Sequence, residues 1–418
     1  MTSRERVMTA VNHEEPDKVP IDLGARQDTG IAASTLYRLR QALGLPEQRV
    51  RIYEPFQMLG LVTDDVREAL GVDTASLEGT GTIFGYELKD WKEWDWIDGA
   101  KALVPGDFNT CPEPDGTIYQ YPQGDKSASP TGQMPRGGFY FDAIIRQGLV
   151  DDDKLNPRDN LEEFQPISDE ALAHFASEAA RLERTAYAVV ATFCATTLGD
   201  TGIVGAMLLK HPRGIRSAEE WYVSLLTRKD YVHAVFQGIV DNGIRNLEKC
   251  AAAVGDKAQI VALSGADYGT QRGPLFSVDI YRELFKPYHK TINDWVHQNT
   301  SWKTWMHSCG GVEPLIPEFI EAGFDILNPV QCSAEGMDPV RLKREYGEDI
   351  VFWGGGVNTQ ETLPFGTPEE VRREVIERLE VFSPGGGYVF NPTHNIQPRT
   401  PIQNVLAMFE AVREFNGD

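Results

Sequence analysis

The sequence predicts an α/β fold, a (β/α)8 barrel formed by residues 1–418 as a single domain. From about residue 170 onward, short runs of apolar, β-branched and aromatic residues alternate with amphipathic helical segments, which is typical of βαβ units in a parallel sheet. Eight such units close into a barrel. An open doubly wound sheet is the alternative, but no GxGxxG or Walker phosphate-binding loop follows any of the runs.

The expected strands and helices alternate along the chain. The strands cover residues 17–23, 73–79, 187–193, 259–265, 302–309, 324–330, 349–355 and 386–392. The helices cover residues 3–11, 32–45, 169–185, 228–255, 278–299, 312–323, 338–347, 367–382 and 401–415. The second helix ends at Gly44-Leu45-Pro46, since glycine and proline commonly terminate helices.

Residues 85–140 depart from this alternation. They are rich in Trp, Gly, Pro and Asp and alternate only weakly in hydrophobicity, which favours hairpins and loops. We therefore expect an excursion of the chain over one end of the fold. Residues 151–160 read as a surface loop.

Composition and charge exclude several classes of protein. A net charge of −22 disfavours binding to nucleic acid and to anionic lipid surfaces. No apolar run is long enough to span a membrane, and the charged N-terminus is no signal peptide. The cysteines are few, odd in number and widely spread, which favours free thiols and a cytoplasmic location: Cys111, Cys194, Cys250, Cys309 and Cys332.

His307 and Cys309 stand at the end of an expected strand. Active sites of barrels lie at the carboxyl ends of the strands, and residues two apart in a strand point to the same face. An imidazole and a thiolate supply half of a tetrahedral zinc site, and a third ligand would come from another strand end. His394 is the first choice for it and Cys332 the second. Alternatively, Cys309 is a small buried hydrophobe and His307 a hydrogen-bonded core residue.

Other polar residues follow the expected strands. Asp267 and its neighbour Tyr268 are the candidate catalytic residues, because Asp267 could hold a histidine in one tautomer or bind substrate; alternatively, it caps a turn. Arg26 could bind an anionic group of the substrate. Neutral amides suit substrate orientation: Gln271, Asn328, Gln331 and Gln397. These amides and the aromatic residues Tyr268, Trp305 and Trp353 indicate a small substrate that is uncharged or aromatic.

Three blocks of the sequence carry a resemblance to a known family. They are SRERVMTAVNHEEPDKVPIDLG near the N-terminus, HSCGGVEPLIPEFIEAGFDILNPVQ from His307, and YVFNPTHNIQPRTPIQNVLAMFEAV from Tyr388. The chain resembles the uroporphyrinogen decarboxylase superfamily over nearly its whole length. The resemblance implies a (β/α)8 barrel and one of two chemistries. One is metal-free decarboxylation of porphyrinogens, and the other is zinc-dependent methyl transfer between a corrinoid and a small substrate.

Departures from the family patterns distinguish the two chemistries. The decarboxylases carry an Arg-Gln-Ala-Gly-Arg-Tyr signature, whereas this chain has Arg26-Gln27-Asp28-Thr29-Gly30. The second arginine is missing and an acid is added, so a polyanionic porphyrinogen would meet a poorer cationic cleft. The methyltransferases carry His-x-Cys, matched by His307 and Cys309, and a third thiolate near the last strand. That third position falls at His394, where the decarboxylases also carry a histidine.

The resemblance therefore implies a zinc-dependent methyltransferase or demethylase, with His307, Cys309 and His394 as metal ligands. The corrinoid (cobalamin) would come from a separate partner protein, since the chain shows no Asp-x-His-x-x-Gly motif. A homodimer is expected by analogy. One alternative is a metal-free decarboxylase that works through Arg26, Asp267 and His394. Another is a barrel that binds a small molecule without turnover.

Overall fold

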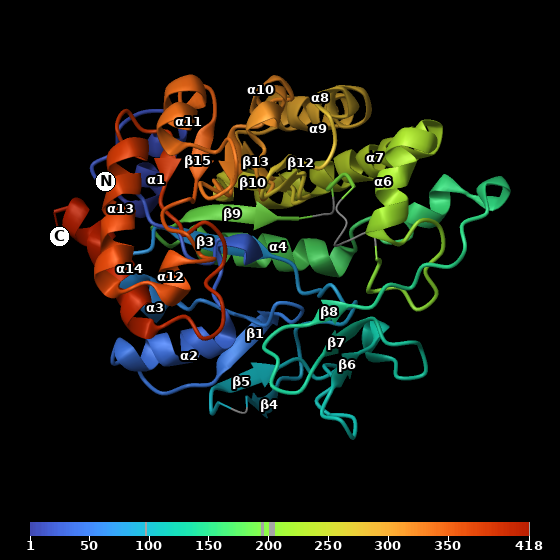
Figure 1. Cartoon of the computed structure of the whole chain (residues 1–418), viewed down its shortest axis with the longest axis horizontal. Coiled ribbons are helices and arrows are strands. Elements are labelled where there is room, and N and C mark those ends of the chain that lie inside the picture. The colour runs from blue at the N-terminus through green and yellow to red at the C-terminus, as the bar shows by residue number, and fades with distance from the viewer. Residues whose placement is uncertain (97, 194–195, 200–204, 418) are drawn as a thin grey trace.

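The computed structural model describes residues 1–96, 98–193, 196–199 and 205–417, so Cys194 lies outside the described residues. Within these ranges, seven strands form a parallel sheet of order β16-β15-β14-β13-β10-β9-β3 (Figure 1). Their bounds are β3 Thr74–Glu78, β9 Ala188–Thr192, β10 Ile260–Ser264, β13 Lys303–His307, β14 Ile326–Asn328, β15 Val351–Trp353 and β16 Tyr388–Val389. This sheet confirms the α/β class and seven of the expected strands.

The expected strand over residues 17–23 is wrong, because this segment forms only one bridge, between Ile21 and Phe390. The N–H of Phe390 donates to the carbonyl of Pro20 at 2.9 Å, and the N–H of Asp73 donates to the carbonyl of Ile21 at 2.8 Å. The segment thus lies between the two edge strands of the sheet, β16 and β3. Pro20 has no N–H to donate, which limits pairing here. A barrel closed by an eighth full strand stays a prediction.

Helices surround the parallel sheet, most of them along its outer face (Figure 1). Their bounds are α1 Ser3–Val11, α2 Ala33–Ala42, α3 Asp64–Leu70, α4 Asp169–Leu182, α6 Ala218–Thr227, α7 Lys229–Val254, α8 Val278–Ile280, α9 Lys286–Asn299, α10 Ile316–Glu321, α11 Pro339–Tyr346, α12 Thr362–Phe365, α13 Pro368–Phe382 and α14 Ile402–Phe415. The helix expected over 278–299 is α8 and α9 joined by a π-helical turn. Helices α3, α6 and α12 were not predicted.

Helix α1 lies at the amino ends of the strands. The N–H of Arg4 donates to the carbonyl of Ala186 just before β9, and the carbonyl of Ala10 accepts from Gly387 just before β16. Val7 and Val11 of this helix are buried, and they belong to one apolar cluster with inward-facing strand residues: Val190, Ile260, Ala262, Trp305, Ile326, Val351, Trp353 and Val389. The carboxyl ends of the strands are left for polar groups.

Residues 85–140, which were predicted to form hairpins and loops, supply strands to two small sheets that lie below the parallel sheet in Figure 1, and these sheets also take strands from outside this range. One sheet has the order β2-β1-β5-β4 and another β6-β7-β8. Their bounds are β1 Val50–Glu54, β2 Leu59–Gly60, β4 Lys92–Asp95, β5 Lys101–Val104, β6 Ile118–Gln120, β7 Gly132–Met134 and β8 Asp142–Ala143. Packed rings of Trp94, Phe108 and Phe141 explain why this part is rich in aromatic residues.

Two further short strands, β11 Gly269–Thr270 and β12 Gly273–Pro274, form a hairpin after β10. Two 3-10 turns, Asp152–Lys154 and Pro157–Leu161, occupy most of residues 151–161. No helix in the described part of the chain is long and apolar enough to cross a membrane.

Candidate metal centre

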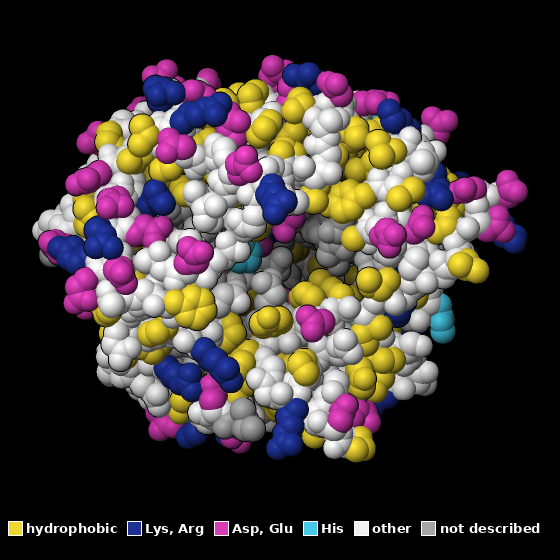
Figure 2. All heavy atoms as spheres, viewed as in Figure 1, with side chains coloured by type: hydrophobic (Ala, Val, Ile, Leu, Met, Phe, Trp, Pro, Cys, Tyr) yellow, Lys and Arg dark blue, Asp and Glu magenta, His cyan; other side chains and the backbone are white. Residues whose placement is uncertain are grey.

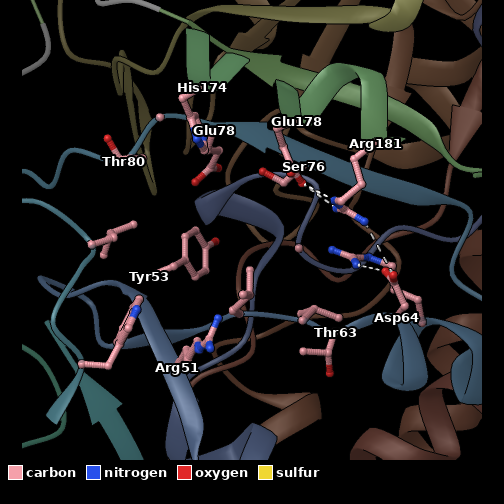
Figure 3. A pocket seen from close by; sticks show the side chains of 17 residues that line it. Arg51, Tyr53, Thr63, Asp64, Ser76, Glu78, Thr80, His174, Glu178 and Arg181 are labelled. Carbon is pink, nitrogen blue, oxygen red and sulfur yellow. Dashed lines mark hydrogen bonds and ion pairs between the residues drawn. The ribbon is translucent and has the colours of Figure 1, made fainter. Parts of the chain in front are cut away.

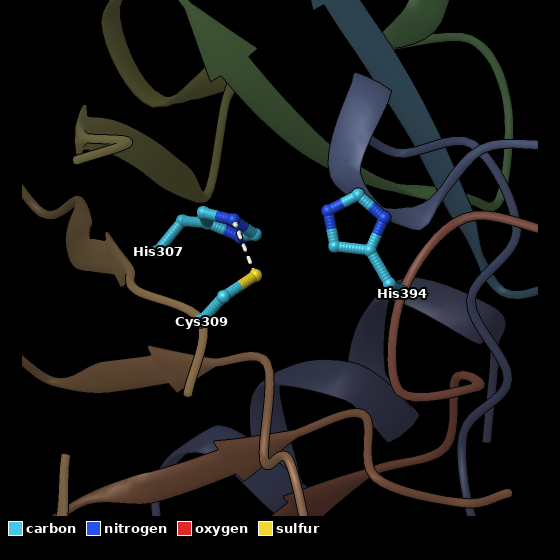
Figure 4. A group of neighbouring side chains, drawn as sticks. All are labelled: His307, Cys309 and His394. Carbon is cyan, nitrogen blue, oxygen red and sulfur yellow. Dashed lines mark hydrogen bonds between the residues drawn. The ribbon is translucent and has the colours of Figure 1, made fainter. Parts of the chain in front are cut away.

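Three side chains meet at the carboxyl end of the parallel sheet (Figure 4). His307 is the last residue of β13, and Cys309 lies two residues later in the chain. His394 lies in the loop after β16. Their ligand atoms all lie within 4.8 Å of one another, and Cys309 Sγ is 3.5 Å from His307 Nε2. His307 is buried, whereas the other two are partly exposed. The structure thus brings together the three residues predicted as metal ligands.

The donor set fits a catalytic zinc ion. Zinc in such sites takes three protein ligands from imidazole, thiolate and carboxylate and keeps one position open. Ligand atoms bound at about 2.0–2.3 Å to one ion lie somewhat closer together than in this group, so a small adjustment of the three side chains would close the site. Burial of His394 and the nearby His307 lower the pKa of His394, which favours the neutral, metal-binding imidazole.

Asn328 was predicted to bind substrate, but its side chain faces His307. Its Oδ1 lies 2.7 Å from His307 Nδ1, and its Nδ2 donates to the carbonyl of Trp353 at 2.9 Å. Asn328 is fully buried. Its amide therefore supports a candidate ligand and does not face a substrate cavity.

Asp28 is a residue of the site that sequence reasoning missed. Its Oδ2 lies 3.6 Å from His307 Nδ1 and accepts from Arg26 at 2.9 Å. Burial alone would raise the pKa of this carboxyl, but its interactions with His307 and Arg26 lower it to about 2. Arg26, which was predicted to bind an anionic substrate, is thus neutralised within the chain. Asp28 lies between the two arginine positions of the decarboxylase signature, and this acid was the sequence feature that could have revealed its ion pair with Arg26.

The two candidate catalytic residues point in different directions. Asp267 lies beside the metal group, since its Oδ1 accepts from the N–H of Cys309 at 2.8 Å and lies 3.6 Å from His307 Nε2. Tyr268 is buried in an aromatic cluster, and its hydroxyl donates to the carbonyl of Leu198 at 2.7 Å. The structure places Asp267 at the site and gives Tyr268 a packing role.

Three of the predicted substrate amides line one cavity together with Cys309 and His394: Gln271, Gln331 and Gln397. The cavity has a volume of about 580 Å³, which lies within the range usual for small-molecule sites. Gln331 Oε1 accepts from the N–H of Gly310 at 2.8 Å. Its Nε2 donates to Gln360 Oε1 at 3.3 Å, so Gln360 is a further polar group that the sequence did not single out.

Cys332, the second choice for the third ligand, does not join the group. Burial raises the pKa of its thiol to about 11, so the thiolate needed for metal binding is disfavoured. Trp305 and Trp353 likewise do not reach the cavity: they pack against each other in the interior of the sheet, with ring centroids 4.6 Å apart. They supply no evidence for an aromatic substrate.

A second cavity of about 480 Å³ lies near the carboxyl end of β3. Figure 3 shows Arg51 and Tyr53 of β1 on one side, and Ser76 and Glu78 of β3 with His174 of α4 on the other. Burial raises the pKa of Glu78 to about 7, and the positive charge of Arg26 opposes this rise. Arg26 thus acts on Glu78 of this cavity and is also paired with Asp28, which lies 3.6 Å from His307. The molecular face in Figure 2 is hollowed near its centre.

Comparison with known proteins decides the family. The family model described as Uroporphyrinogen decarboxylase (URO-D) matches residues 155–415. The chain belongs to the uroporphyrinogen decarboxylase family. Its likeness to individual decarboxylases is more limited: it is 33% identical to the enzyme of Coxiella burnetii over 89 residues, which are 20% of this chain and 24% of that protein. It is 23% identical to the enzyme of Gloeobacter violaceus over 66% of this chain and 74% of that one.

A solved structure shares the fold over nearly the full length. A methyltransferase from Methanosarcina mazei aligns with a TM-score of 0.56 and 16% identity and covers 99% of both chains. This likeness shows that the two chains share a fold. The activity of this chain is a separate question, which its own site residues must answer.

Proposed function

We propose that this protein is a zinc-dependent methyltransferase that moves a methyl group between a small substrate and a corrinoid carried by a separate protein. The proximity of His307, Cys309 and His394 at the carboxyl end of the parallel sheet carries the proposal. Membership of the uroporphyrinogen decarboxylase family supports an enzyme. The Methanosarcina mazei protein with this fold bears the name of a methyltransferase, which is compatible with the same activity.

Each group of the site has a part in this proposal. Zinc held by His307, Cys309 and His394 would polarise an ether oxygen or lower the pKa of a bound thiol or hydroxyl. Asp267 holds the backbone of Cys309 in place. The amides of Gln271 and Gln331 line the adjoining cavity and can orient an uncharged substrate there. A corrinoid protein could approach the site from the open side of this cavity.

Decarboxylation has weaker support. A decarboxylase of this family would need free cations for the substrate carboxylates, but Arg26 is bound to Asp28 at 2.9 Å. Position 30 is glycine, so it offers no second cation in the signature segment. Asp28 is anionic, because its pKa is held at about 2, and it would repel a substrate carboxylate.

Metal analysis tests the proposal. Protein purified without added metal or a metal-binding tag should contain about one zinc per chain. The Cys309→Ala variant should lose the metal, because it removes the thiolate ligand. Cys332→Ala is the matched control, since Cys332 lies outside the ligand group and its loss should leave the zinc content unchanged. The loaded wild type should also demethylate methylcobalamin in the presence of a suitable acceptor, followed by absorbance.

A folded wild type that stays free of zinc after incubation with the metal would contradict the proposal. Loss of zinc from the Cys332→Ala variant to the same extent as from Cys309→Ala would contradict the assignment of the ligands.

A further inference from the structure

We propose that Asn328 is a positioning residue that fixes the tautomer of His307, so that Nε2 and not Nδ1 is presented to the metal. The inference rests on the proposed function, because it concerns the zinc ion of the same site. It assigns to Asn328 a part in building the metal site that residue type and spacing do not reveal.

The orientation of the Asn328 amide is decided by Trp353. The carbonyl oxygen of Trp353 can only accept a hydrogen bond, and it lies 2.9 Å from Asn328 Nδ2. The NH₂ group must therefore face Trp353, which leaves Oδ1 facing His307 Nδ1 at 2.7 Å. An amide oxygen accepts only, so Nδ1 must carry the proton. In the neutral imidazole, Nε2 is then the ring nitrogen with a free lone pair.

The free nitrogen points to the correct side. His307 Nε2 lies 3.5 Å from Cys309 Sγ, and the ring of His394 stands 5.6 Å from the ring of His307. In the opposite tautomer, the proton on Nε2 would occupy the place where the metal binds. Selection of the tautomer is therefore a condition for this group to act as a ligand set.

Asp28 is the competing acceptor for the same nitrogen, but it is too far away. Its Oδ2 lies 3.6 Å from His307 Nδ1, beyond hydrogen-bond distance, and is bound to Arg26. Asn328 thus orients the imidazole without adding a negative charge to it. A carboxylate in that place would make His307 a stronger electron donor and the metal a weaker Lewis acid.

The strands hold this contact rigidly. His307 and Asn328 are opposite each other in the register of β13 and β14, and the N–H of Ser308 donates to the carbonyl of Asn328 at 2.7 Å. Both side chains are buried, so water has little access to replace the amide if it is lost. A substitution at Asn328 should therefore act on the histidine directly.

Two variants and a control test the role. Asn328→Leu has a similar size but no hydrogen-bonding atoms, so His307 should lose its fixed tautomer, and the affinity for zinc alone should fall about 10- to 100-fold. Asn328→Asp keeps an acceptor for Nδ1 and should keep the Nδ1–H tautomer. Asn404→Leu is the matched control, because Asn404 is also buried and donates to carbonyls, of Leu363 and Gly366, away from the site. It should bind zinc as the wild type does.

Zinc affinity is measured by competition with a chromophoric chelator, and the tautomer by ¹⁵N NMR of histidine-labelled, metal-free protein. A metal-free wild type with the proton on Nε2 would overturn the inference. So would an Asn328→Leu variant with unchanged tautomer and unchanged zinc affinity. If the wild type binds no zinc at all, the proposed function fails, whereas the tautomer in the metal-free protein still decides the role of Asn328.

Discussion

The charges of single side chains determine what the metal group can do. Two neutral imidazoles and one thiolate would leave a divalent zinc ion with one net positive charge, whereas a second thiolate would cancel it. The anionic Asp28 nearby is already paired with Arg26, so the pair adds little net charge. A zinc ion in this environment would keep more of its Lewis acidity, which would suit polarisation of a substrate oxygen.

The buried Glu54, which is not one of the candidate metal ligands, predicts that the stability of the fold depends on pH. Burial raises its pKa to about 7, and the backbone N–H groups of Phe56 and Gln57 oppose this rise. The folded protein therefore keeps the proton in the range where the unfolded chain, with an ordinary pKa of 4.5, loses it. Wild-type stability should fall between pH 4.5 and 7 relative to Glu54→Gln, by up to about 3 kcal/mol.

Urea unfolding of metal-free protein at pH 4.5, 6 and 8 measures this difference. Glu380→Gln is the control, because Glu380 is exposed, and its stability relative to the wild type should not change across this range. A constant difference between Glu54→Gln and the wild type at all three pH values would show that Glu54 titrates alike in both states.

Two strand-end loops cross with their backbones in contact, and this crossing sets the place of Cys309. The N–H of Gly311 donates to the carbonyl of Thr270 at 2.8 Å. A Cβ on Gly310 would lie 2.7 Å from the carbonyl oxygen of Gly269, and the φ of Gly310 is +89°. The loop after β13 can therefore follow this path only with glycine at position 310.

Gly310→Ala should accordingly lower both the stability and the zinc affinity, because the clash pushes the residue next to Cys309 away from the hairpin of β11 and β12. Gly44→Ala is the matched control, since Gly44 also has a positive φ, of +68°, but its added Cβ meets no atom within 4 Å. The control should lose only about 1–2 kcal/mol of backbone strain and bind zinc normally. Equal zinc affinities of the two variants, measured by chelator competition, would refute the argument.

The hydrophobic pattern of the sequence predicted the helices and strands better than it predicted the contacts between them. The periodicity gave the alternating helices and strands, and the strand ends gave His307, Cys309 and His394. Residues 17–23 were misassigned, because pairing at the edge of a sheet depends on partners distant in sequence. The directions of Tyr268 and Asn328 could not be predicted for the same reason, since a strand end offers several cavities and the packed neighbours select one.

The two ends of the parallel sheet have different tasks in this architecture. The carboxyl ends of the strands carry the candidate metal ligands His307, Cys309 and His394 and the adjoining cavity. The amino ends are covered by α1, whose Val7 and Val11 complete the apolar interior. In barrels generally, residues at the carboxyl ends of the strands serve catalysis, and residues at the amino ends serve stability. Substitutions at the amino end should therefore destabilise the fold without changing the metal site.

Val7→Ala tests this separation. Val7 is 0% exposed, so the variant should leave a cavity in the interior core and lose about 2 kcal/mol of unfolding free energy. The melting temperature should fall by a few degrees, whereas zinc affinity should equal that of the wild type. Val340→Ala is the control, because Val340 is 56% exposed and should change neither quantity. If Val7→Ala weakens zinc binding well below its melting temperature, the two ends of the sheet are coupled, and stability and chemistry are not separable in this protein.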